Sequence, residues 1–429
     1  MKFTAVGDVI IGRRIQEGFE GIDELAPIIN RADAKFFNLE TTLNKEGECF
    51  ASQVSGGTYL RTDPEVLEDV KRFGFNMTSF NNNHAMDYSF DGLLATFDAV
   101  ERSGLVHSGV GRNLGEASAP AYLETKMGRV ALISVNSSLS GQMVAGEQSG
   151  RIKGRPGVNP LRRVDSVVLE KDDFEKIQEI IKKSGINAQR EISKKEGYQG
   201  GVDGSVYIGN INFVCGEQPC IRSKINERDL ERIEKSIHEA KLQADYIVIS
   251  LHAHELGGRE KEEPAAFIKE FAHFCIDKGA HAVVGHGPHL LRPIEIYNGR
   301  PIFYSLGDFV LQLYNIEFAP DELYSQYGLT TRDTVHDLLK KRSKDFTIGL
   351  MTDKRMFTTV IPYWEMEDGR LTQLTLYPVL LSMDGNKSEI GLPRLCTDPE
   401  LLSDFIERCK RYGTEMTRNS DGSYDVKID

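Results

Sequence analysis

Two histidines stand three residues apart in a short loop that follows a buried-looking strand. The apolar run 282–284 predicts the strand, and the glycines and proline directly after it predict a tight turn. The loop therefore carries His286 and His289 at a strand end, which is where α/β sheets place their ligands. Neutral imidazole is a common ligand for transition metals, so the pair suggests a metal site.

Four more polar clusters follow apolar runs of the same kind. They are Gly7-Asp8, Asn38-Leu39-Glu40, Asn81-Asn82-Asn83-His84 and His252-Ala253-His254. Each alone also fits an ordinary structural role, such as a turn aspartate, an exposed glutamate, an asparagine-rich turn or a core histidine. Three successive asparagines are nevertheless a poor continuation of a strand and a poor helix interior. Five such clusters, all at expected strand ends, indicate a site more strongly than any one of them.

The donor atoms in these clusters suit a divalent transition metal. Carboxylate, asparagine carbonyl and imidazole ligands together fit one or two ions of Mn²⁺, Fe²⁺ or Zn²⁺, whereas Ca²⁺ prefers an all-oxygen shell. Such ions would activate a water and polarise a phosphoryl or carbonyl oxygen. His84, beside the asparagines, is of a type that protonates leaving groups. His252 and His254 point to the same side of an extended chain, so either can be the ligand and the other its support.

The elements that would position these residues alternate between strands and helices. Strand-like runs lie at 3–6, 34–37, 77–80, 130–134, 246–250, 281–284 and 302–305. Helical patterns fall between them, most clearly at 92–100 and 264–277, where apolar residues recur at helical spacing and a glycine follows. This alternation predicts an α/β sheet covered by helices.

Two charged segments interrupt the alternation. Residues 138–240 begin Gly- and Arg-rich and continue as charged helical stretches, and residues 314–356 are charged and partly helical, most clearly at 334–341. We predict a core formed by residues 1–137 and 241–313, with both segments inserted into or after it. Residues 357–429 would add C-terminal strands and a helix that pack on this core.

The net charge and the apolar content of the chain limit the kinds of partner that it can bind. The chain has 429 residues and a formal net charge of −12, which argues against nucleic acid, because phosphates demand a basic face. Basic residues at 151–155 and 162–163 either contact an anionic substrate, small or polymeric, or form a solvated face. No run approaches the roughly 20 apolar residues of a membrane segment. The first residues lack the long apolar core of a signal peptide, so we expect a cytoplasmic protein.

The order of the motifs resembles the calcineurin-like metallophosphoesterases, and their wording resembles one branch, the poly-γ-glutamate capsule biosynthesis (CapA-type) proteins. The resemblance covers most of residues 1–312 apart from the insertion. The matching phrases are Gly7-Asp-Val-Ile-Ile-Gly-Arg13, Asn38-Leu-Glu40, Asn82-Asn-His-Ala-Met-Asp-Tyr88, Gly109-Val-Gly111, Ser250-Leu-His252, Gly285-His-Gly-Pro-His289 and Tyr304-Ser-Leu-Gly-Asp-Phe309.

The resemblance implies a fold and a set of roles. The fold is a four-layer α/β/β/α metallophosphoesterase-like sandwich, here with inserted helical segments. The implied metal ligands are Asp8, Glu40, Asn83, His252, His286 and His289. The resemblance also implies that His84 is the general acid or charge-stabilising histidine and that Arg13 and Asp87 support it.

Four positions depart from the pattern of the resembled proteins. Ile10 stands where metallophosphoesterases usually have a histidine, so one metal site is expected to be weak or empty. Glu40 replaces a bridging aspartate, as it does across this branch. Asp308 replaces an asparagine, and it either adds a carboxylate or has no role. His254 alters a His-Trp-Gly phrase, which leaves the choice of ligand between His252 and His254 open.

Two functions of different classes fit these observations. The first is a metal-dependent hydrolase of a phosphoester or, as a weaker alternative, of an amide such as a γ-glutamyl bond. The second is a non-catalytic or accessory protein of poly-γ-glutamate or cell-envelope polymer synthesis. Members of the resembled family that take part in polymer synthesis are usually anchored in a membrane or exported. Because this sequence shows no such segment, we expect the enzyme.

Overall fold

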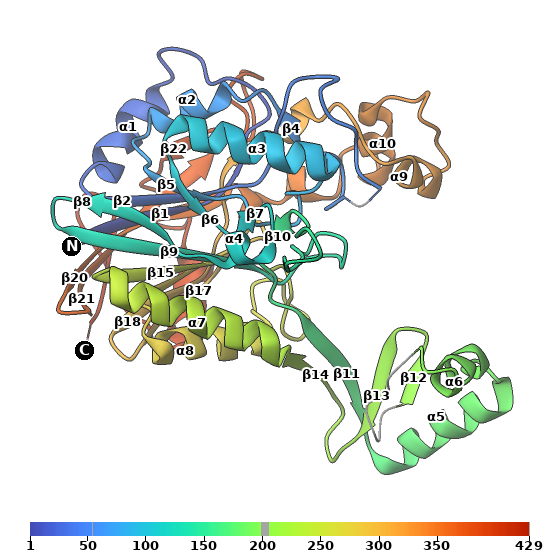
Figure 1. The fold of residues 1–429 in the computed structure, drawn as a ribbon. Helices are drawn as coiled ribbons and strands as arrows, with labels where there is room; N and C mark the ends of the chain where they lie inside the picture. The colour runs from blue at the N-terminus through green and yellow to red at the C-terminus, as the bar shows by residue number, and fades with distance from the viewer. Residues whose placement is uncertain (54, 199–205, 429) are drawn as a thin grey trace. The chain divides into compact units, whose positions relative to one another are not determined.

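The protein divides into two compact units. The computed structural model describes residues 1–53, 55–198 and 206–428. One unit comprises Met1–Pro160 and Glu231–Asp429, and the other comprises Leu161–Leu230 (Figure 1).

A ten-stranded sheet forms half of the larger unit. One part of it consists of parallel strands: β1 (Lys2–Ile10), β2 (Ala34–Leu39), β5 (Met77–Ser79), the edge strand β6 (Val106–Ser108) and, beside β1, β19 (Asp308–Leu311). The C-terminal part of the chain extends the sheet with antiparallel strands: β20 (Thr358–Glu367), β21 (Arg370–Leu381), β22 (Pro393–Leu395), β23 (Met416–Arg418) and β24 (Tyr424–Val426).

A six-stranded sheet forms the other half. Four of its strands are parallel: β9 (Gly128–Asn136), β15 (Tyr246–His252), β16 (Ala282–His286) and β18 (Arg300–Leu306). The antiparallel strands β8 (Ala121–Thr125) and β17 (Leu291–Tyr297) close its two edges. Both sheets therefore contain a parallel portion whose carboxyl ends can carry a site.

The two sheets pack face to face, and helices cover their outer faces (Figure 1). Phe3 and Ala5 of the first sheet share a buried apolar cluster with Val248 and Phe303 of the second. A separate cluster packs the outer face of the first sheet against α1 (Glu20–Ile29), α2 (Val66–Lys71) and α3 (Ser89–Ser103). On the second sheet, α8 (Ala266–Lys278) contacts β16 and β18, and α7 (Glu227–Gln243) lies beside it. The predicted four-layer α/β/β/α sandwich is confirmed.

Short elements complete the larger unit. They are β3 (Thr42–Leu43), β4 (Arg61–Thr62), β7 (Val110–Gly111), α4 (Leu114–Ser118), β10 (Gly157–Val158), three 3₁₀ turns (Leu313–Asn315, Leu350–Thr352, Lys354–Phe357), α9 (Asp321–Gln326), α10 (Val335–Arg342) and α11 (Ser403–Lys410). None of the helices in the described ranges combines the length and the apolar content that a membrane crossing requires.

The smaller unit is shorter than the predicted insertion of residues 138–240. It holds a four-stranded sheet in the order β12-β13-β11-β14, with the following elements: β11 (Arg163–Leu169), α5 (Lys171–Ser184), α6 (Ala188–Lys195), β12 (Val206–Ile208), β13 (Ile211–Cys215) and β14 (Cys220–Ile225). Residues before it belong to the larger unit, because β10 pairs with β7 there. The end of the predicted insertion, from residue 231, also belongs to the larger unit as part of α7.

The segment 314–356 contains the helix that its sequence pattern predicts. Thr334 caps α10: its hydroxyl accepts from the Asp337 amide at 3.2 Å, and the Asp337 carboxylate accepts from the Thr334 amide at 3.0 Å. This reciprocal pair satisfies two amides that a helix start leaves without partners. Val335 and Leu338 of α10 join Ala319 and Tyr324 in a small apolar core. The segment 314–356 is therefore folded around its own small apolar core and is not an open loop.

Strand β1 is longer than predicted. The sequence pattern ends the strand at residue 6, but β1 runs to Ile10 and includes Asp8. Its pairing with β2 and β19 shifts register around Asp8, which lies directly opposite Asp308. The backbone of Gly7 approaches Gly307 so closely that a Cβ at residue 7 would lie 1.9 Å from the Gly307 oxygen. This approach, which sequence periodicity does not reveal, brings the two aspartates side by side.

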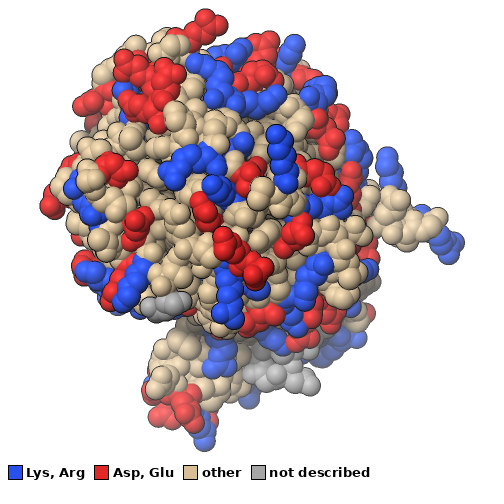
Figure 2. Space-filling view, turned by 90° about the vertical axis from the view of Figure 1, so that its left-hand side faces the viewer, with Lys and Arg blue, Asp and Glu red and all other residues tan. Residues whose placement is uncertain are grey.

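The face of the molecule in Figure 2 intersperses basic with acidic side chains and does not gather the basic ones into one patch. Two of the basic residues that we considered as substrate contacts are engaged within their own units. The Arg155 guanidinium donates to the Val144 carbonyl at 3.1 and 2.9 Å, and Arg162 pairs with Asp229 at 2.6 Å. The absence of a nucleic acid partner stays a prediction.

Replacement of Gly7 by alanine tests the close approach of β1 to β19. We expect Gly7→Ala to lower the free energy of unfolding by at least about 1–3 kcal/mol, because the added methyl group overlaps backbone that cannot move aside. Chemical denaturation of the metal-free protein measures this change. Gly141→Ala is the matched control, since a Cβ there meets nothing within 4 Å. Equal stabilities for the two variants would contradict the described approach.

Candidate metal centre

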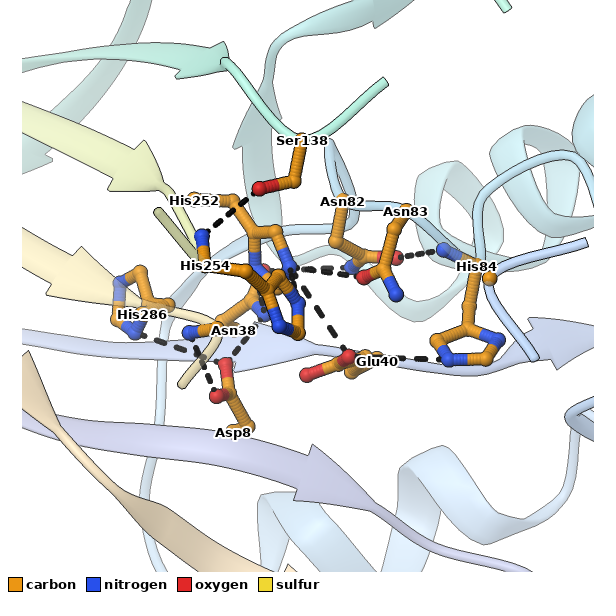
Figure 3. Close-up of polar contacts among 12 residues, drawn as sticks. Asp8, Asn38, Glu40, Asn82, Asn83, His84, Ser138, His252, His254 and His286 are labelled. Carbon is orange, nitrogen blue, oxygen red and sulfur yellow. Dashed lines mark hydrogen bonds and ion pairs between the residues drawn. The ribbon is translucent and has the colours of Figure 1, made fainter. Parts of the chain in front are cut away.

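The predicted polar clusters meet where the carboxyl ends of both parallel strand sets converge. Asp8 lies in β1, Glu40 follows β2, Asn83 follows β5, His252 ends β15 and His286 ends β16. The structure brings these five side chains and His254 to one point (Figure 3). His289 also lies there, with its Nε2 atom 4.0 Å from Oε1 of Glu40. All seven predicted ligands are thus neighbours, although they come from five separate parts of the chain.

Glu40 lies at the middle of the cluster. Its Oε1 atom is 4.0 Å from the Nε2 atoms of His84, His252 and His289. These separations are too long for hydrogen bonds, but ligands that share one cation typically lie about 3–4 Å apart, given metal–ligand distances near 2 Å. Glu40 is fully buried, and neither of its carboxylate oxygens accepts a hydrogen bond from a described residue. Its surroundings fit a residue that ligates a metal.

His286 shows the same pattern. Its imidazole is fully buried, and among the described residues neither ring nitrogen has a hydrogen-bond partner. The Nδ1 atom lies 3.8 Å from Oδ1 of Asp8. Burial lowers the pKa of His286 to about 3, so the ring is neutral, which is the form that binds metals. Buried polar atoms without partners are rare in proteins, and two on one ring favour a ligand role.

Asp8 is held in place by two hydrogen bonds. The Asn38 side-chain amide donates to Oδ1 at 2.7 Å, and the Gly287 amide donates to Oδ2 at 2.9 Å. Burial and the negative charge of Asp308 raise the pKa of Asp8 to about 7. Burial and the charge of Asp8 raise the pKa of Glu40 well above its usual value. Burial therefore destabilises the charged forms of Asp8 and Glu40 unless a cation is bound beside them.

Asp308 is a member of the cluster that the sequence left undecided. It is fully buried, and its Oδ1 lies 2.9 Å from Nδ1 of His289. Its Oδ2 has no partner among the described residues. The sequence did contain a signal for Asp308: the dipeptide Gly307-Asp308 repeats Gly7-Asp8 and also follows an apolar run. Asn38, which orients Asp8, was not among the predicted site residues, because Glu40 was the candidate ligand of that cluster.

Three overlapping groups of side chains have ligand atoms within 4.8 Å of one another. They are Asp8 with Glu40 and His252, Asp8 with His289 and Asp308, and Glu40 with His254 and His289. Asp8, Glu40 and His289 each belong to two groups, so the cluster has room for more than one arrangement of ligands. His289 also adopts a left-handed backbone conformation with φ of 60°, which few residues other than glycine adopt.

His252 and His254 both face the cluster. Their Nε2 atoms lie 3.1 Å apart, and Nε2 of His252 also lies 2.8 Å from the Asn83 carbonyl oxygen. The His254 amide donates to the Ser138 hydroxyl at 2.7 Å, which fixes the chain after β15 (Figure 3). Burial and the neighbouring imidazoles lower the pKa of both rings well below the usual value. Both residues therefore stay candidates for the ligand.

His84 and Asp87 form a pair at the edge of the cluster. Nδ1 of His84 lies 2.6 Å from Oδ2 of Asp87, which leaves Nε2 directed toward Glu40. Asp87 also accepts from the Leu60 amide at 2.8 Å and the Gly56 amide at 3.3 Å. Asp87 thus positions His84 and anchors the loop 55–60, a part of the site that sequence reasoning did not identify.

Arg13 is not brought to the cluster. The chain leaves the site after Ile10, and the Arg13 amide donates to the Gln312 side chain at 3.1 Å. Within the described ranges, no hydrogen bond or ion pair joins the Arg13 guanidinium to the residues of the cluster. Its predicted supporting role therefore has no contact in this structure.

Comparison with known proteins identifies the family. A family model described as bacterial capsule synthesis protein PGA_cap matches residues 2–313. The chain belongs to this family. An uncharacterized protein of Sinorhizobium fredii, y4sH, is 33% identical over 429 residues, which cover 96% of this chain and 90% of that protein. The PGA biosynthesis protein CapA of Bacillus subtilis is 25% identical over 86% of this chain and 80% of its own length.

Among solved structures, one described as a novel phosphatase of Mycoplasma pneumoniae aligns with a TM-score of 0.42 and 12% identity. The alignment covers 89% of this chain and 93% of that one.

Replacement of Glu40 by glutamine tests whether the cluster holds a metal. With free Mn²⁺ at 100 times its dissociation constant, the wild-type protein should gain about 2.7 kcal/mol in unfolding free energy. Loss of even an outer-shell partner typically costs 10–100-fold in metal affinity, so Glu40→Gln should keep no more than about 0.4–1.4 kcal/mol of this gain. Denaturation with and without Mn²⁺ provides the measurement.

Glu46→Gln provides the matched control for this test. It is the same chemical change as Glu40→Gln, but Glu46 is exposed and lies away from the cluster. We expect the control to retain the full Mn²⁺-dependent gain. A gain in Glu40→Gln equal to that of the wild-type protein would contradict the ligand role of Glu40.

Proposed function

We propose that this protein is a metal-dependent hydrolase and that its substrate is a phosphoester. The proposal rests on one observation above all: the fully buried Glu40 carboxylate has the Nε2 atoms of His252 and His289 4.0 Å from one of its oxygens and no hydrogen-bond donor among the described residues. Such an arrangement is costly without a cation and favourable with one.

The proposed ligands of one or two Mn²⁺, Fe²⁺ or Zn²⁺ ions share a place in the cluster. They are Asp8, Glu40, Asn83, His252, His254, His286, His289 and, added from the geometry, Asp308. A divalent metal bound there would polarise the substrate and activate water for attack. Carboxylates and imidazoles in one site suit these transition metals better than Ca²⁺.

His84 is the proposed general acid. In phosphoester hydrolysis the oxygen of water bonds to phosphorus, the bond from phosphorus to the ester oxygen breaks, and the departing alcohol takes up a proton. Nε2 of His84 is directed toward the cluster, where it would donate this proton or stabilise the developing charge. Asp87 holds Nδ1 of the same ring at 2.6 Å and so fixes its orientation.

The alternative is a role in capsule polymer synthesis without catalysis, or hydrolysis of a γ-glutamyl amide. The names of the relatives favour it, since they include a PGA biosynthesis protein and, in Mycobacterium tuberculosis, a probable polyglutamine synthesis accessory protein. A purely structural scaffold would gain stability by replacing the unpaired buried groups with apolar ones, so the cluster supports the enzyme. We also propose a cytoplasmic location.

Two histidine variants separate metal binding from catalysis. His286→Ala should lower the metal content of the purified protein, because it removes a proposed ligand. His84→Ala should keep the metal and lose about 10²–10⁴-fold in kcat, the usual contribution of a general acid. The exposed His238 supplies the control, and His238→Ala should change neither quantity. Elemental analysis and a panel of phosphomonoesters, phosphodiesters and γ-glutamyl anilides provide the measurements.

The outcomes distinguish the candidate functions. Equal metal content in His286→Ala and wild-type protein would contradict the ligand assignment. Undiminished hydrolysis in His84→Ala would contradict its proposed role. A wild-type protein that binds metal but turns over neither class of substrate would favour the accessory role in polymer synthesis.

A further inference from the structure

A largely apolar cavity opens directly onto the candidate metal centre. It has a volume of about 240 Å³, and Asn83, His84, His254 and His289 line one end of it. The remaining lining residues are mostly aliphatic or aromatic, including Ile10, Leu60, Leu311, Leu313, Tyr314, Ile316, Leu339, Phe346, Ile348, Leu350 and Met351. Whatever reacts at the metal centre must therefore lie beside an apolar surface.

The far wall of this cavity comes from the segment 313–352. Helix α10 places Leu338 in the small core of the segment and Leu339 in the cavity lining. The capping box at Thr334 fixes the start of this helix and hence the position of both leucines. The wall is thus held by its own core, which makes the cavity a built feature of the fold.

The mouth of the cavity is apolar too. Tyr314, Phe346 and Ile348 line the cavity and are 57%, 37% and 48% exposed. Exposed apolar side chains gathered at one pocket usually mark a binding surface. Among the described lining residues, Arg342 is the one with a permanent positive charge. A polymer with a carboxylate on every repeat would meet too few cations here to offset the loss of its hydration.

We infer that the substrate of this site is an amphiphile, in which a phosphoester carries an alkyl or aryl group that occupies this cavity. The inference rests on the proposed function for the position of the phosphoester. An apolar cavity of roughly 150 Å³ accommodates benzene. A volume of about 240 Å³ therefore suits a group slightly larger than one aromatic ring, or a chain of about six carbons.

A ladder of alkylphosphonates tests the inference without requiring turnover. The carbon–phosphorus bond resists hydrolysis, so calorimetry on the metal-loaded full-length protein reports binding alone. From methyl- to hexylphosphonate, we expect the dissociation constant to fall about two- to fourfold per added methylene, as burial of each CH₂ predicts. The trend should level off once the cavity is full. A dissociation constant independent of chain length would overturn the inference, and so would tighter binding of a γ-glutamyl oligomer.

Variants of the lining tie the trend to this cavity. Leu339→Ser and Ile348→Ser should each flatten the dependence on chain length and leave methylphosphonate binding unchanged. Two positions are tested because Ile348 is half exposed and its replacement should not disturb folding. Ile152→Ser is the control, since Ile152 is 68% exposed and does not line the cavity. A slope that all three variants preserve would place the apolar group elsewhere and overturn the inference.

The matching series of alkyl phosphates separates this inference from the proposed function. Chain-length-dependent binding of phosphonates without hydrolysis of any phosphate would support the cavity and contradict the hydrolase. Hydrolysis of the phosphates with the same kcat/KM at every chain length would support the hydrolase and contradict the cavity. Propyl phosphate compared with glycerol phosphate adds a polar control of equal carbon count, and we expect the propyl ester to be preferred.

Discussion

Three carboxyl groups, those of Asp8, Glu40 and Asp308, lie fully buried within one cluster at the junction of the two sheets. Two like charges 4 Å apart repel by about 4 kcal/mol at the effective dielectric constant typical of proteins, and burial adds a desolvation cost to each. The attraction of each carboxylate to a bound divalent cation would offset both costs. The close approach of Gly7 to Gly307 sets the two aspartates side by side, an arrangement that a bound cation would stabilise.

The two sheets contribute different chemistry to this cluster. The ten-stranded sheet and the loops after its strands supply the carboxylates and Asn83, while the six-stranded sheet supplies His252, His254 and the histidines at 286 and 289. Neither sheet alone holds a mixed ligand set. The cluster exists only when the apolar faces of both sheets pack together, so metal binding should be coupled to the packing of the whole sandwich. Disruption of the core packing should therefore weaken metal binding, and metal binding should stabilise the core.

Much of this site could be predicted from sequence, because polar residues that directly follow apolar runs announce the carboxyl ends of parallel strands. That logic located the carboxylates and imidazoles of the cluster, whereas the four-layer fold was implied by the family resemblance. It failed where the contact is non-local. The partnership of Asp308 with Asp8 depends on strand register, and the wall that α10 builds resembles an ordinary surface helix in sequence. The resemblance implied a supporting role for Arg13, but among the described residues no hydrogen bond or ion pair joins its guanidinium to the cluster.

The most direct test of the metal centre is a crystal structure of the protein soaked in Mn²⁺, with anomalous diffraction recorded to locate the ion. Our account predicts one or two anomalous peaks within ligand distance of Glu40, with Asp8, Asp308 and the clustered histidines around them. Peaks confined to surface carboxylates, or a cluster that stays free of metal at Mn²⁺ concentrations that saturate the surface sites, would contradict it.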